Sequence, residues 1–175
     1  METRTIRIGL LALIGVGVLV FLLIKVFGDD DSNNNGPEGL SQSELISRAS
    51  SFDHPAYWVG PQAGTSQYEL TQTSDARIYV RYLTGSASVG ANQPNYVTVG
   101  TYPVSNAKDA LKRSKAGGGT GALLHLPGRD VLEGGSGMNV YVVFDNQPDL
   151  QIEIFDPTAG TALKFATSGD VQPIP

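Results

Sequence analysis

An unbroken apolar segment near the N-terminus constrains this chain more than any other feature. Ile8 to Ile24 is 17 residues without a polar side chain, and Lys25, Val26 and Phe27 extend the segment to 20. Twenty helical residues span about 30 Å, the thickness of the hydrocarbon core of a bilayer. A small soluble domain has no use for a helix that is apolar on every face. Residues 8–27 are therefore predicted to form one transmembrane helix, with the lipid bilayer as partner.

The charges beside this segment predict its orientation. Arg4 and Arg7 precede it, whereas Asp29, Asp30 and Asp31 follow it. Positive flanking charge stays on the cytoplasmic side, so residues 1–7 are expected inside the cell and the remainder outside. The expected location is the cell membrane, with a single pass. A cleaved signal peptide, giving a secreted protein, is the alternative; the apolar run is longer than a usual signal core, and no A-x-A cleavage site follows.

Charge and cysteine content exclude several classes of function. Residues 28–175 carry nine Lys/Arg against sixteen Asp/Glu, a net charge of −7, which disfavours nucleic acid as a partner. The chain has no cysteine and hence no disulfide, zinc-thiolate site or thiol nucleophile. No cofactor motif is found, and none is expected.

Residues 28–40 are predicted to be a flexible polar linker, because 28–39 contain no apolar side chain. The run Asp31-x-Asn33-x-Asn35-Gly36 is similar to the start of a calcium-binding loop. The twelfth position of that loop would be Gln42 instead of the required bidentate Glu, so a solvated tether is the favoured interpretation.

Residues 41–175 have the pattern of one extracytoplasmic α+β domain. Its helices are expected at 41–50, after a Ser41/Glu44 capping box, from Ser105 to Gly117, and from Asp156 to Gly169. Hairpins are expected at 68–83 and 138–155. Alternating side chains suggest that each strand buries one face, against helices. The prediction is a mainly antiparallel sheet of five to six strands with two to three packed helices, from strands at 68–73, 77–83, 96–102, 122–126, 138–144 and 150–155.

Four short stretches together resemble a known group of proteins. They are H-P-A-Y-W-V-G-P at 54–61, R-I-Y-V-R-Y-L at 77–83, V-G-T-Y-P at 99–103 and S-G-D-V-Q-P at 168–173. The group consists of single-pass, membrane-anchored proteins of actinobacteria to which no function is assigned. The resemblance implies a location and a source, and it carries no active site.

Catalytic and metal motifs are weak throughout the chain. His54 and His125 are 71 residues apart and have no second histidine at ligand spacing. The run at 134–138 lacks the last glycine of a G-x-S-x-G nucleophile elbow and leads into a strand. No catalytic or metal residue is assigned, although Asp53, His54 and Ser136 would form a hydrolase site if folding brought them together.

Two groups of residues remain as candidate contacts for a ligand or partner. Tyr57 and Trp58 lie between two prolines and are interpreted as a core plug, or alternatively as a stacking platform for a sugar or peptide. Four cations on the predicted second helix form either a solvated face or a docking patch for an anionic partner. They are Lys108, Lys112, Arg113 and Lys115.

These observations favour a non-catalytic domain that binds a partner or takes part in envelope assembly. An envelope protein or a cell-wall polymer is the expected partner. The alternative is an envelope hydrolase whose site is assembled from dispersed residues.

Overall fold

The computed structural model describes residues 35–116 and 121–175, and all structural statements below refer to these residues. These residues form three helices and ten strands. Their order is β1 (Asn35–Leu40), α2 (Gln42–Ala49), β2 (Tyr57–Trp58), β3 (Thr65–Gln72), β4 (Ile78–Thr84), β5 (Thr98–Pro103), α3 (Ala107–Ala116), β6 (Leu123–Leu126), β7 (Arg129–Glu133), β8 (Asn139–Phe144), β9 (Leu150–Phe155), α4 (Thr161–Ser168) and β10 (Gln172–Pro173).

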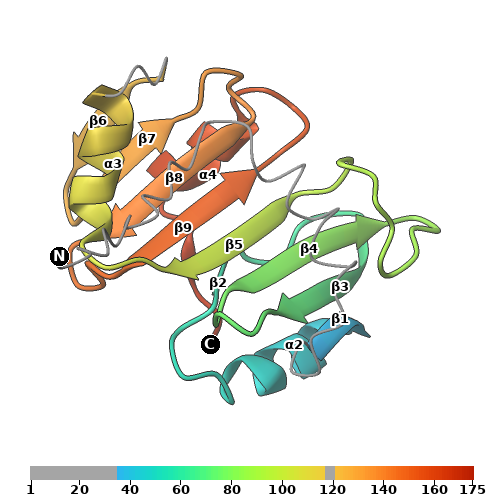
Figure 1. The fold of residues 1–175 in the computed structure, drawn as a ribbon. Coiled ribbons are helices and arrows are strands. Elements are labelled where there is room, and N and C mark those ends of the chain that lie inside the picture. Colours follow the sequence, from blue (N-terminus) through green and yellow to red (C-terminus); the bar gives the residue numbers. More distant parts are fainter. Residues whose placement is uncertain (1–34, 117–120) are drawn as a thin grey trace, which may run out of the picture.

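Eight of the strands form one sheet in the order β1-β3-β4-β5-β9-β8-β7-β6, and every neighbouring pair is antiparallel (Figure 1). Strands β10 and β2 form a separate two-stranded sheet. The predicted α+β class with a mainly antiparallel sheet is confirmed. The sheet is larger than the five to six strands predicted from the sequence, and three helices pack on it.

Local sequence signals explain how several elements begin and end. Ser41 caps α2: its hydroxyl accepts from the Glu44 backbone N–H, and the Glu44 carboxylate accepts from the Ser41 N–H. The hydrogen bond from the Ser41 side chain is the main cause that lowers the pKa of Glu44. Between β6 and β7, Pro127 fixes one turn position and Gly128 takes the positive φ of 78° that the next position requires.

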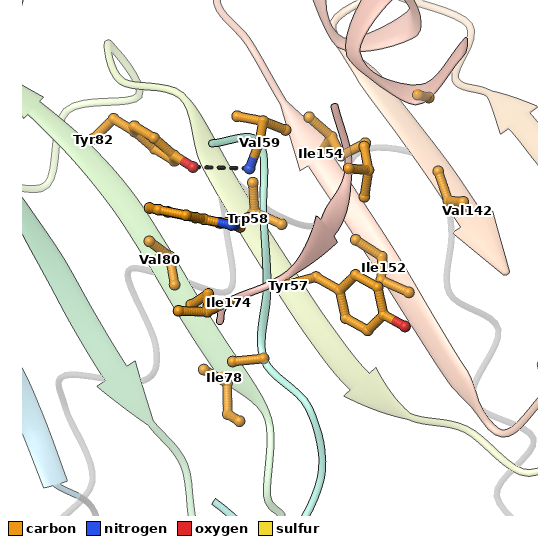
Figure 2. Close-up of a cluster of buried hydrophobic side chains, with 14 of the residues drawn as sticks. Tyr57, Trp58, Val59, Ile78, Val80, Tyr82, Val142, Ile152, Ile154 and Ile174 are labelled. Carbon is orange, nitrogen blue, oxygen red and sulfur yellow. Dashed lines mark hydrogen bonds between the residues drawn. The ribbon is translucent and has the colours of Figure 1, made fainter. Parts of the chain in front are cut away.

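One face of the sheet, here called the core face, carries the apolar residues of the long strands. Val80, Val99, Val142 and Ile154 are completely buried on it. Helix α2, helix α4 and the β2/β10 pair cover this face through Leu45, Ala162 and Ala166, Trp58 and Ile174, among others. Figure 2 shows Trp58 lying over Val80 of β4, whereas Tyr57 points towards Ile152 of β9.

The opposite face, here called the polar face, is also covered, which the sequence did not predict. Helix α3 packs on β7 and β8 from this side, and Figure 1 shows α3 and α4 on opposite sides of β8. Its apolar contacts are with Leu132, Tyr141 and Val143, which alternate with the core-face residues of the same strands. The expectation that each strand buries only one face is therefore wrong for β4, β8 and β9.

Two segment boundaries differ from the prediction. Residues 35–40, assigned to the linker from their composition, form β1 and pair with β3. The last helix begins at Thr161 and not at Asp156, because the Asp156 carboxylate accepts a hydrogen bond from the Thr158 N–H and holds a turn. Its predicted end at Gly169 is confirmed by a left-handed C-cap.

The predicted membrane segment at 8–27 lies outside the described residues, as does most of the linker. Within residues 35–116 and 121–175, none of the helices has the length and apolar character needed to cross a bilayer.

Candidate functional site

Tyr57 and Trp58, the aromatic pair singled out from the sequence, lie in the core with side chains 3% exposed. The Tyr57 ring stacks on Phe144 at a centroid distance of 5.3 Å, and the Trp58 ring packs against Tyr68 at 6.2 Å. The next residue is also fixed, because the Val59 N–H donates to the Tyr82 hydroxyl over 2.9 Å (Figure 2). This position is that of a core plug, and it leaves no ring face open for stacking.

The four cations of α3 do not form one charged face. Lys108 is directed to two carboxylates, bonding Asp145 and lying 4.0 Å from Asp130. The hydrogen bond to Asp145 raises the pKa of Lys108. Lys115 donates to the Gly121 carbonyl. Lys112 and Arg113 are exposed at the C-terminal end of the helix, with Lys112 3.8 Å from Asp109.

A buried carboxylate, Glu153, lies at the centre of the polar face and was not singled out from the sequence. It is 5% exposed and accepts hydrogen bonds from the Asn139 amide at 2.7 Å and the Tyr102 hydroxyl at 2.9 Å. Burial raises the pKa of Glu153, and these hydrogen bonds act in the opposite direction. Burial also raises the pKa of Tyr102 well above its ordinary value, and the charge of Glu153 adds to that shift.

Gly100 makes room for this arrangement. It lies directly across from Glu153 in the β5–β9 pair. A Cβ atom at Gly100 would lie 2.6 Å from the Tyr102 hydroxyl oxygen, closer than van der Waals contact allows. Because Gly100 has no side chain, the Tyr102 ring can lie over it and its hydroxyl can reach Glu153.

A buried charge pair joins β3 and β4 on the same face. Arg81 and Glu69 meet at 2.7 Å and are 3% and 1% exposed. The other Glu69 oxygen accepts from the Gly90 N–H at 2.7 Å, and Arg81 donates to the carbonyls of Ala91 and Gln93. The Arg81 guanidinium also lies 5.3 Å from the centroid of the Tyr96 ring. This pair therefore holds the loop of residues 85–97 against the sheet.

The residues considered for hydrolysis are not brought together. His54 has the carbonyl oxygens of Pro55 and Ala76 at 3.1 and 2.7 Å from its ring nitrogens, which places it just before β4 begins. Ser136 precedes Asn139, which aligns through Phe155 and Thr98 with Arg81, the middle residue of β4. His54, with Asp53 next to it in the sequence, therefore lies before the start of β4, whereas Ser136 lies beyond the level of its middle residue.

His125 links the edge strand β6 to its neighbour β7. Its Nδ1 donates to the Asp130 carboxylate at 2.8 Å, across the β6–β7 pair, and the His125 side chain is 66% exposed. Asp130 is shared with Lys108, so one carboxylate connects β6, β7 and α3. Within residues 35–116 and 121–175, no group of three or more metal-binding side chains is assembled.

The two buried carboxylates had a weak sequence signal. Glu69, Arg81 and Glu153 alternate with apolar residues, a pattern that usually marks a solvent-facing side. The distinguishing feature is the tyrosines on that same face, Tyr79, Tyr102 and Tyr141, because a half-solvated sheet has little need of them. Comparison with protein-family models, with curated proteins and with solved structures gave no match for this chain.

Proposed function

We propose that this protein is a membrane-anchored, extracytoplasmic domain that acts by binding a partner in the cell envelope and carries out no catalysis. The apolar segment 8–27 would hold it in the bilayer, with residues 1–7 in the cytoplasm. The partner would be an envelope protein or a cell-wall polymer.

The proposal that the domain is not catalytic rests on one observation: the buried charged groups on the polar face are hydrogen-bonded within the protein. Glu153 and the Glu69–Arg81 pair are buried, and each is hydrogen-bonded to other strands or to the 85–97 loop. Groups held in this way position the sheet and its loop, and a reacting substrate would have to displace them. The hydrolase alternative has less support, since His54 lies before the start of β4 and Ser136 lies beyond the level of Arg81.

The exposed end of α3 is the surface that best suits a partner. Lys112 and Arg113 project from its C-terminal turn, whereas Lys108 is engaged with Asp130 and Asp145. A partner contact there would depend on Lys112 and Arg113 more than on Lys108.

The anchor and its orientation are tested by cysteine labelling, because the chain contains no cysteine of its own. Ala63→Cys, in an exposed turn, is expected to react with a membrane-impermeant maleimide on intact cells. Glu2→Cys is expected to react only after lysis. The proposal fails if Ala63→Cys also needs lysis, and release of a shortened chain into the medium would instead support the signal-peptide alternative.

The binding role is tested by recovery of partners from detergent-solubilised native membranes, using the full chain as bait. Lys112→Ala/Arg113→Ala is expected to recover less partner than the native chain. Lys164→Ala, an exposed cation on α4, is the matched control and should change nothing. Equal recovery by all three chains would exclude this end of α3 as the binding surface.

A further inference from the structure

The two edges of the eight-stranded sheet differ in how well they can accept another strand. Strand β1 contains Pro37 and two glycines, and its pairing with β3 is irregular between Asn35 and Glu38. Proline and irregular pairing are the usual means of protecting an edge from added strands. Strand β6 is Leu-Leu-His-Leu, without proline, glycine or an irregularity in its pairing with β7.

The outward backbone groups of β6 follow from its pairing. The Glu133 N–H donates to the Ala122 carbonyl, so Ala122 is hydrogen-bonded towards β7. Hydrogen-bonding direction alternates along a strand, and Leu124 and Leu126 therefore also face β7. The N–H and C=O groups of Leu123 and His125 consequently point away from the sheet.

We infer that β6 pairs with β6 of a second copy of this chain, antiparallel and about a two-fold axis at Leu124. This register places Leu123 of each copy across from His125 of the other, so that both outward-facing residues form hydrogen-bonded pairs. Moving the two-fold axis to His125 would place His125 across from His125 of the second copy. Leu123 would then lie across from Pro127, which has no N–H to donate. Moving the axis to Leu123 would pair Gly121 with His125 of the second copy, but the Gly121 carbonyl already accepts a hydrogen bond from Lys115.

Side chains on the core face agree with a second copy as occupant. Leu124 and Leu126 are only partly buried against the core cluster, and each would gain an apolar neighbour across the axis. Such cross-strand pairs stabilise an antiparallel sheet. The two-fold axis keeps both α3 helices on the same side of the joined sheet.

Charge favours the same arrangement. The exposed cations Lys112 and Arg113 lie at the end of α3 near Gly121, whereas Lys108, at the end near Gly128, is paired with Asp145. Antiparallel copies keep Lys112 and Arg113 of the two chains at opposite ends of the joined strands. Parallel copies would bring like charges together, which is unfavourable for pairing. This inference rests on the proposed function, because it names the partner of that binding domain.

The register predicts a specific disulfide. In antiparallel sheets, Cα atoms of residues in a pair without backbone hydrogen bonds lie about 4.5 Å apart, within the span of a disulfide. Full-length Leu124→Cys, oxidised in native membranes, is expected to give a covalent dimer as its main product on non-reducing gels. Pro127→Cys is the matched control: its two copies would lie six residues out of register, roughly 20 Å apart, and should not crosslink.

A second variant tests the backbone pairing itself. His125→Pro removes an outward N–H and leaves the bonds from Leu124 and Leu126 to β7 intact. In the Leu124→Cys background it is expected to reduce crosslinking at least tenfold relative to His125→Ala, which loses the same side-chain contact with Asp130 but keeps the outward N–H. Equal crosslinking with and without proline would overturn the inference, as would equal crosslinking of Leu124→Cys and Pro127→Cys.

The native chain gives an independent measurement. In detergent, sedimentation is expected to show a dimer for the native chain and a monomer for His125→Pro; a native monomer overturns the inference. Carbonate extraction of the same membranes separates the two proposals. A chain that stays in the membrane but does not crosslink leaves the anchor intact and rejects the β6 pairing. A chain that is extracted rejects the anchor.

Discussion

Trp58, the only tryptophan, shows at the residue scale how the core is closed. Its side chain fills the space between the sheet and the β2/β10 pair, and among the described residues its indole N–H has no hydrogen-bond partner. The indole therefore contributes through its volume and apolar area, and not through a polar bond.

Trp58→Ala is expected to lower the free energy of unfolding by about 3–5 kcal/mol, the usual cost of removing a large buried aromatic side chain. Trp58→Phe should cost clearly less, because it retains most of the ring and gives up no hydrogen bond. Denaturant unfolding followed by circular dichroism compares the three chains. An alanine variant within 1 kcal/mol of the native chain would contradict the plug interpretation.

Glu153 makes the stability of the protein depend on pH in a defined direction. Burial raises its pKa in the native state, so the native chain holds a proton at pH values where the unfolded chain has lost it. The contribution of Glu153 to stability is therefore complete below the unfolded pKa, about 4.3, and is lost as pH rises through the native pKa.

The stability of the native chain relative to Glu153→Gln should accordingly fall as pH increases above about 4.3. Denaturant unfolding of both chains between pH 4 and pH 8 measures this difference, in which the titration of other groups cancels. Glu38→Gln, on the exposed edge strand, controls for loss of one surface charge. A difference that rises with pH would mean that the native pKa is lowered.

The loop of residues 85–97 depends, at the scale of elements, on one buried pair. Removing one member of a buried ion pair leaves the other charge uncompensated, at a cost of about 3–5 kcal/mol. Arg81→Met should therefore destabilise the protein by that amount and release the Gly90 N–H from Glu69.

Hydrogen exchange gives the more specific measurement, with faster exchange expected at Gly90 in Arg81→Met. Arg77→Met is the matched control, four residues earlier on the same side of the chain, where Arg77 forms an exposed pair with Asp75. Such pairs contribute about 0–1 kcal/mol, so this variant should leave both stability and Gly90 exchange nearly unchanged. Unaltered protection of Gly90 in Arg81→Met would show that other contacts hold the loop.

The elements that were predictable are those with strong local signals. The capping box predicted α2, and the alternation of apolar residues predicted β3, β4, β8 and β9. Strand β7 was missed because Arg129-Asp130-Val131-Leu132-Glu133 holds only two apolar residues. Two of its polar residues contact neighbouring elements: Arg129 bonds α4, and Asp130 contacts α3 and β6. Strand β1 was missed because its pairing comes from the backbone and not from apolar side chains.

The candidate sites were less predictable than the fold, because their geometry depends on distant segments. Burial of Trp58 needs β10, which is 114 residues further along the chain. The neutralisation of Lys108 needs Asp130 and Asp145, which local spacing on α3 does not reveal. Glu153 needs Gly100 and Tyr102 on the neighbouring strand.

At the scale of the whole molecule, residues 171–174 fix the β2/β10 pair against the core face of the long sheet. Val171 and Ile174 are 3% and 8% exposed in the core, and the Ile174 N–H donates to the Ala56 carbonyl at 2.8 Å. Through β10 they keep β2, with its aromatic pair, against the long sheet.

Deletion of residues 170–175 should therefore destabilise the protein by roughly 3–6 kcal/mol, from two buried side chains at about 1.5–3 kcal/mol each. It should also shift the Trp58 emission to longer wavelength, as the ring becomes hydrated. Deletion of the exposed Pro175 alone is the control, and it should change neither quantity. Unchanged emission from the longer deletion would show that β10 is not needed to cover Trp58.

The position of β1 has a mechanical consequence. Any tension that enters the domain from residues before Asn35 reaches the sheet through this edge strand, whose pairing with β3 is irregular at that end. A pull across the strands would separate the β1–β3 hydrogen bonds one at a time, whereas a pull along them would load the whole row together. Under a pull across the strands, β1 would detach at low force while the other seven strands of the sheet stay joined. The detached strand would lengthen the segment that precedes the domain.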